Sequence, residues 1–191
     1  MPSLAELDSP VRSFLESIAP HAGAAPDVEA IGRRLAEFAR DLDYLGHHIS
    51  RLDPARFGSR ELANTSPGEP LLLLVHRPEG VMSATHSHRV WVALAPITGC
   101  ETHRRYDVIA ERPDHTAKLA LAEERHLDAH SSDFVTMTPP DDVHAHGHVE
   151  GIGEAAYILV LTGQHQVQFE RRQYDLAAGT WQPLPPGVMQ R

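Results

Sequence analysis

The chain has 191 residues, of which 41% are hydrophobic, and this is enough to bury the core of one domain. Its formal net charge of -9, with no long basic run, argues against nucleic acid or an anionic membrane as a partner. A single cysteine, Cys100, excludes an intramolecular disulfide, and neither a secretory-signal profile nor a membrane-length apolar stretch is found. We therefore expect a cytoplasmic protein with one domain.

Two amphipathic helices are predicted in the first 49 residues. Ser9 and Pro10 form a cap and first-turn pair, and apolar residues follow at helical spacing at Val11, Phe14, Leu15 and Ile18. After a turn of small residues, Asp27 caps a second helix whose apolar positions are Val28, Ile31, Leu35, Phe38, Leu42 and Leu45. We expect residues 1–49 to form a helical segment packed on the rest of the domain.

From about residue 50 the pattern changes to short β-rich runs separated by prolines and glycines. The predicted strands cover residues 70–77, 88–97, 102–110, 134–137, 155–161 and 167–174. Residues 117–127 fit a helix by propensity and a strand by their position, so both remain open. The proline-rich residues 182–188 are expected to form a surface tail. Residues 50–191 therefore predict a β-structure.

Fourteen histidines invite a metal hypothesis, and two of them have a suitable spacing. His86 and His88 are separated by one residue, so in a strand both imidazoles point to the same side. His144 follows the rigid Pro139-Pro140 turn and is the expected third ligand. His146 is the alternative, because a shift of one pleat would exchange the two residues.

The spacing around these histidines resembles the two metal-binding motifs of the cupin superfamily. Gly80, His86, His88 and Gly99 match the first motif, and Pro139 and His144 match the second. The glutamate of the first motif is replaced by Val92, and Asp141 and His148 replace the glycine and asparagine of the second. The resemblance implies a mostly β, double-stranded β-helix (jelly-roll barrel) with two N-terminal α-helices.

A three-histidine set without the carboxylate is similar to the cysteine dioxygenase group, including the bacterial mercaptopropionate dioxygenases. The similarity spans roughly residues 27–184 and is specific only in the motif stretches. Members of this group carry a Ser-x-His-x-Tyr set before a glycine after the third ligand. Aligned through Gly163, those positions hold Ile158, Val160 and Thr162 here, so fold and metal transfer more safely than substrate.

Further site residues are expected around the metal. Arg60 lies where the resemblance places a substrate-carboxylate clamp, and Tyr106 shares a strand face with Arg104 that is expected to line the barrel. If His144 is the ligand, His146 is expected either to act as a base or substrate contact beside the metal or to be solvated. The remaining histidines have no ligand spacing, and most are expected to be exposed: His47, His48, His103, His115, His126, His130 and His165.

The resemblance implies an iron(II), O2-dependent dioxygenase that acts on a small anionic substrate, most readily a thiol. The alternative is a metal-binding cupin without redox chemistry, in which zinc or nickel supports hydrolysis, isomerisation or ligand sensing, since three imidazoles suit these ions equally well. A small-molecule substrate is the only partner expected, and both a monomer and a homodimer fit the sequence.

Overall fold

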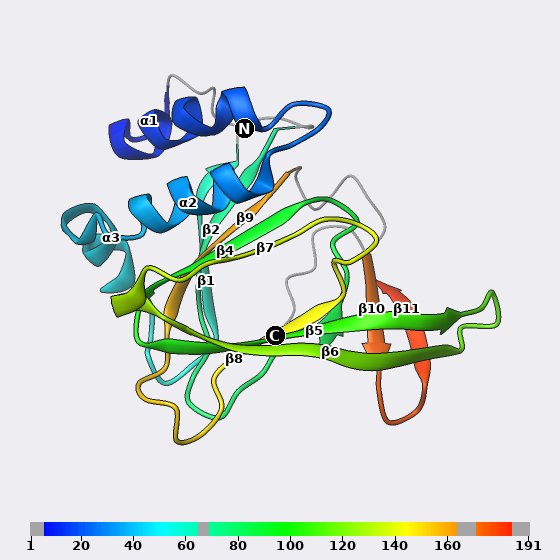
Figure 1. Ribbon diagram of the computed structural model, residues 1–191. Helices are drawn as coiled ribbons and strands as arrows, with labels where there is room; N and C mark the ends of the chain where they lie inside the picture. Colours follow the sequence, from blue (N-terminus) through cyan, green and yellow to red (C-terminus); the bar gives the residue numbers. More distant parts are fainter. Residues whose placement is uncertain (1–5, 65–68, 164–170, 185–191) are drawn as a thin grey trace.

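The computed structural model describes residues 6–64, 69–163 and 171–184, and it contains two antiparallel β-sheets and three α-helices (Figure 1). The first sheet has five strands in the order β1 (Gly58–Asn64), β2 (Leu71–His76), β9 (Tyr157–Thr162), β4 (Val92–Thr98) and β7 (Val135–Met137). The second has six in the order β11 (Thr180–Leu184), β10 (Arg171–Asp175), β3 (Thr85–His86), β8 (His144–Gly147), β5 (Cys100–Glu111) and β6 (Ala117–Asp128).

The strand order is that of a jelly roll. Apart from the β5–β6 hairpin, each consecutive pair of strands from β2 to β9 crosses from one sheet to the other. The set β2-β9-β4-β7 therefore faces the set β3-β8-β5-β6, which is the arrangement of a double-stranded β-helix. The mostly β, barrel-type fold predicted from the sequence is confirmed.

The N-terminal helices differ from the prediction in number. Helix α1 (Ser9–Ile18) lies where expected, although Asp8 rather than Ser9 occupies its N-cap. The single helix predicted from Val28 to Leu45 is wrong, because it is divided into α2 (Val28–Phe38) and α3 (Leu42–Ile49). Asp41 accepts a hydrogen bond from the backbone N–H of Tyr44 at 3.2 Å and so starts a new helix inside the apolar pattern. The short 3-10 helices η2 (Ala19–His21) and η3 (Ala129–Ser131) complete the helical elements of the described residues.

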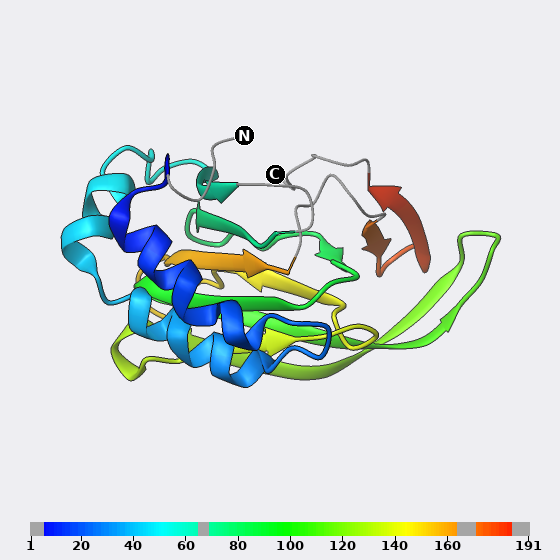
Figure 2. The same ribbon diagram turned by 90° about the horizontal axis from the view of Figure 1, so that it is seen from above.

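Helices α1 and α2 cover the outer face of the five-stranded sheet (Figures 1 and 2). Their apolar sides share one buried cluster with the outward side chains of β2, β4 and β9, such as Leu74 and Leu159. Gly32 makes the close approach of α2 possible, since a Cβ there would lie 2.4 Å from the ring of Phe134. Within the described part of the chain, no helix has the length and apolar character needed to span a bilayer.

Five strands were absent from the sequence prediction or left open. Residues 117–127 lie in β6, while β1, β3, β8 and β11 were not predicted. The expected tail is wrong for residues 182–184, which pair with β10, and residues 185–188 lie outside the described chain. The predicted strand at 167–174 begins at Arg171 in the described part. Strands as short as β8 carry too few residues for an alternation pattern to be read from the sequence.

Candidate metal centre

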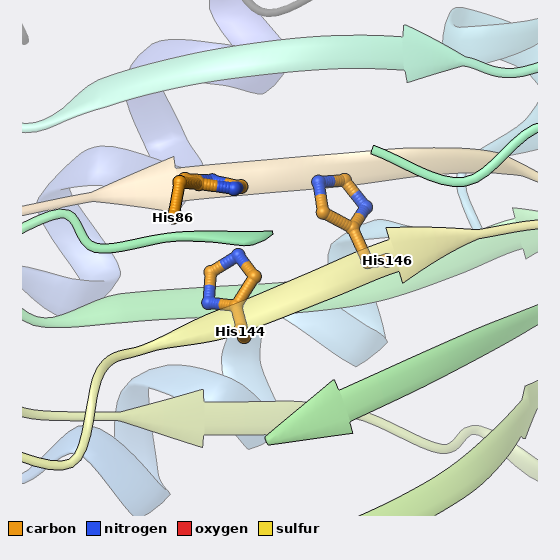
Figure 3. Close-up of side chains that lie close together, drawn as sticks. All are labelled: His86, His144 and His146. Carbon is orange, nitrogen blue, oxygen red and sulfur yellow. The ribbon is translucent and has the colours of Figure 1, made fainter. Parts of the chain in front are cut away.

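The inner side of the six-stranded sheet gathers four histidines at one end of the barrel. His86 on β3 and His144 on β8 are direct partners in the antiparallel register, and His146 is two residues further along β8 on the same face. His88 follows β3. Figure 3 shows the rings of His86, His144 and His146 directed into one common space. All four side chains are at most 5% exposed.

Nitrogens of three of the four rings, those of His86, His144 and His146, lie close enough together to share one ion. Nε2 of His86 and Nε2 of His88 are 2.9 Å apart, and the ring of His144 is 4.5 Å from that of His86 and 5.1 Å from that of His88. One ring nitrogen each of His86, His144 and His146 lies within 4.8 Å of the others. The structure therefore places the alternative ligand His146 in one group with His86 and His144, while His88 contacts His86 but lies outside that group.

The unpaired nitrogens of this cluster fit a metal ion. Both ring nitrogens of His144 and Nδ1 of His88 are buried and have no hydrogen-bond partner among the described residues. Such atoms are costly to bury unless something coordinates them. Burial also lowers the pKa of all four imidazoles well below the ordinary value, so they are neutral, as metal ligands must be.

A carboxylate lies behind His146. Glu101 on β5 is 4% exposed and makes a short contact with Nδ1 of His146. Burial raises the pKa of Glu101 to about 7, while the nearby Arg77 and His103 act in the opposite direction. Together with Gly147 and His148, the side chains of Arg77, Glu101 and His146 line a cavity of about 10 Å³ between the two sheets.

His103 was expected to be exposed with the other isolated histidines, and this was wrong. It is 2% exposed, pairs with His146 across β5 and β8, and its ring centroid is 5.2 Å from that of His144. Burial lowers its pKa to about 3. The prediction failed because polar residues of an alternating strand were assumed to face solvent, whereas here Glu101 and His103 face the barrel interior.

Two buried arginines, Arg77 and Arg171, lie beside the histidines. Arg171 on β10 is 2% exposed, and its charge acts on His86 and His88. Arg77, after β2, is 7% exposed, and its charge acts on His86 and His146. Burial lowers the pKa of both guanidinium groups below their ordinary value. The centre therefore combines neutral imidazoles with fixed positive charge.

The structure does not bring Arg60 and Tyr106 to this cluster. Arg60 lies opposite Leu74 in the β1–β2 register, on the side of the sheet that faces the helices, and its Nε donates to Nδ1 of His48 at 2.9 Å. Tyr106 packs against Ala145, which points away from the inward His144 and His146. His48 is itself only 7% exposed, which also differs from the expectation.

The residues that stand in place of the expected motif residues also lie inside the barrel. Val92, in place of the motif glutamate, and Ile158 and Val160, in place of the serine and histidine, belong to the apolar cluster between the sheets. Thr162 is completely buried. Asp142, before the third predicted ligand, accepts hydrogen bonds from the backbone N–H groups of His88, at 2.8 Å, and of Arg89. Its carboxylate thereby joins the two histidine-bearing segments.

No protein-family model and no curated protein matches the chain. The solved structures similar to it include one of DMSP lyases, with 16% identity, a TM-score of 0.44 and coverage of 62% of this chain and 53% of that one. A double-stranded β-helix protein from Klebsiella pneumoniae matches with 16% identity, a TM-score of 0.42 and coverage of 60% and 78%. An RmlC-like cupin family protein from Methanocaldococcus jannaschii matches with 16% identity, a TM-score of 0.43 and coverage of 60% and 86%. The chain spans about half the length of the lyase chain, and the likeness to all three is one of fold.

Proposed function

We propose that the protein is a mononuclear iron(II), O2-dependent dioxygenase acting on a small anionic substrate, with His86, His88 and His144 as metal ligands. The observation that supports this most directly is the buried ring of His144, which has no hydrogen-bond partner among the described residues and faces the rings of two other neutral histidines. Iron(II), when bound, supplies the electron-transfer chemistry with O2 that no side chain of the cluster provides.

The charges around the cluster favour an anionic substrate. Neutral imidazoles do not reduce the positive charge of a divalent ion, and the buried Arg171 adds a guanidinium beside His86 and His88. A guanidinium group binds a carboxylate with paired hydrogen bonds, and these are strong where water is excluded. By position, Arg171 is a better candidate than Arg60 for holding the substrate carboxylate.

The wall opposite the histidines excludes water. Val92, Ile158 and Val160 are at most 4% exposed and form the inner face of the five-stranded sheet. These residues contribute neither a hydroxyl nor an imidazole with which to orient a substrate, so the ligands and the arginines must do so. The substrate class is therefore tested with small thiols, which the resemblance favours, together with β-dicarbonyl compounds.

A non-redox zinc or nickel protein is the second candidate. It is supported by the convergence of neutral imidazoles, because these donors suit zinc or nickel as well as iron. Bound there, zinc or nickel would support hydrolysis, isomerisation or ligand sensing.

Metal analysis of the freshly purified protein, followed by oxygen uptake after anaerobic loading with iron(II), separates the two candidates. We expect iron, and oxygen consumption above the iron-only background with at least one thiol or β-dicarbonyl compound. The Arg171→Met variant should raise KM for that substrate about 10- to 100-fold while the metal content stays unchanged. Zinc in the purified protein, with no oxygen uptake from any compound after iron loading, would favour the second candidate.

A further inference from the structure

We propose that Glu101 is a positioning residue that makes His146 a fourth imidazole ligand of the metal. This inference rests on the proposed metal centre, but not on the identity of the metal or on oxygen chemistry. The first motif has Val92 in place of its glutamate. In this inference Glu101 supplies a carboxylate that contacts the His146 ring instead.

The backbone of β8 holds His146 in place. The backbone N–H of His146 donates to Oγ of Ser83 at 3.0 Å, and its carbonyl accepts from the backbone N–H of Ser83 at 2.8 Å. Gly147 allows this crossing, since a Cβ at that position would lie 2.3 Å from the carbonyl oxygen of Val81. The ring of His146 therefore leaves the strand at a defined point, 5.5 Å from the ring of His144.

The contact with Glu101 determines which nitrogen of His146 faces the cluster. Because Nδ1 is directed at the carboxylate, Nε2 remains for the metal. His86 shows the same arrangement, with Nδ1 at 2.9 Å from the carbonyl oxygen of Ala84 and Nε2 in the cluster. A ligand imidazole usually donates its second N–H to a carboxylate or a carbonyl in this way.

His148, two residues further along, shows what a buried histidine without a metal role looks like. Its Nδ1 accepts from the backbone N–H of Gly80 at 3.2 Å, and its Nε2 lies 2.9 Å from the carbonyl oxygen of Gly153. Both nitrogens are therefore used by the protein itself. In His146, by contrast, the contact with Glu101 occupies Nδ1 alone, although the side chain is only 5% exposed.

Arg77 completes the arrangement behind the ligand. Its side chain and that of Glu101 line the same small cavity, and its Nη1 is buried without a hydrogen-bond partner in the described chain. Arg77 and Glu101 thus share the space next to His146, where the carboxylate contacts Nδ1 of the ring.

The parent protein loaded with zinc(II) tests the ligand assignment without any catalytic assay. Long-range proton–nitrogen NMR spectra of protein with nitrogen-labelled histidine identify the metal-bound nitrogen of each ring. We expect bound Nε2 signals for four histidines, including His146, whose Nδ1 carries the proton. Zinc bound by His86, His88 and His144 with His146 unaffected would overturn the inference and leave the proposed function standing. No zinc binding at all would overturn both.

The Glu101→Gln variant tests the positioning role, and Glu123→Gln is its matched control on the same hairpin, where the side chain is 49% exposed. We expect Glu101→Gln to weaken zinc binding about 10- to 100-fold, measured by competition with a chelator, and to shift the Nδ1 proton signal of His146. The control should change neither quantity. Unchanged affinity and an unchanged His146 signal in a folded Glu101→Gln variant would refute the positioning role.

Discussion

The two walls of the barrel interior have opposite chemistry. The five-stranded sheet presents mainly apolar side chains to the buried cluster between the sheets, among them Leu71, Leu73, Val75, Ile158 and Val160. The six-stranded sheet presents buried polar ones, among them His86, Glu101, His103, His144 and His146. Because burial of polar groups costs free energy, we assign stability mainly to the first sheet with its helices and chemistry to the second.

The largest expected effect tests whether the five-stranded sheet and its helices provide most of the folding stability. Leu159 on β9 is completely buried and faces the helices rather than the interior. The Leu159→Ala substitution should lower the free energy of unfolding by about 2–5 kcal/mol, because it removes apolar contacts and leaves a cavity. Urea denaturation measures this change, and zinc affinity of the folded protein should stay within about twofold of the parent. A large loss of affinity would show that the two walls are not independent.

The second-largest expected effect is on metal binding by the six-stranded sheet. His144→Ala removes the imidazole at the centre of the cluster, so metal affinity should fall more than about 100-fold, or about 2.7 kcal/mol. The apoprotein should lose little stability, since both ring nitrogens of His144 are buried without a partner in the described residues. Calorimetric titration with zinc and thermal melts with and without a chelator measure the two quantities. Metal retained at full affinity would point to His146 in its place.

The third substitution is in the six-stranded sheet, at Gly147 on β8. Gly147→Ala places a methyl group against the carbonyl oxygen of Val81, so the segment that crosses β8 must move. We expect a loss of about 1–3 kcal/mol in stability together with weaker metal binding, since His146 is the preceding residue. Gly23→Ala is a control for the changed glycine, because nothing lies within 4 Å of a Cβ there. Equal metal affinity in both variants would show that the crossing does not position His146.

The smallest expected effect is a pH dependence of the unfolding free energy that is caused by His48 on α3. Burial first, and then the charge of Arg60, lower the pKa of His48 below its ordinary value of 6.5. As the pH falls, His48 therefore binds a proton in the unfolded chain before it does so in the folded protein. The free energy of unfolding consequently decreases as the pH falls below about 6.5, by at most about 1.4 kcal/mol per pH unit. In His48→Gln, unfolding free energies between pH 7 and 5 should fall less steeply than in the parent. The exposed His130→Gln is the control, and an identical slope in His48→Gln would contradict the prediction.

The sequence alone was sufficient for features that depend on local spacing. The Pro10 helix start, the Asp27 cap, the apolar strands and the His86-x-His88 pair each rest on residues that are neighbours in the chain. The mostly β fold also followed from these local patterns together with the resemblance of the motif spacing to cupins. Local patterns were misleading where one residue changed their meaning, as when Asp41 ended the predicted second helix.

Only the tertiary structure decided which polar residues meet. Glu101, His103 and His146 come from strands whose pairing is set by crossings between the two sheets, and Arg171 comes from a strand beyond them. Alternation in a strand shows that two faces differ, but it does not show which face is inside, and for β5 the polar face lies inside at Glu101 and His103. Arg60 was expected at the centre from the resemblance and Tyr106 from its strand face, and the sheet directs both of them away from it. The histidine pair was thus readable from the chain, while its surroundings required long-range strand pairing.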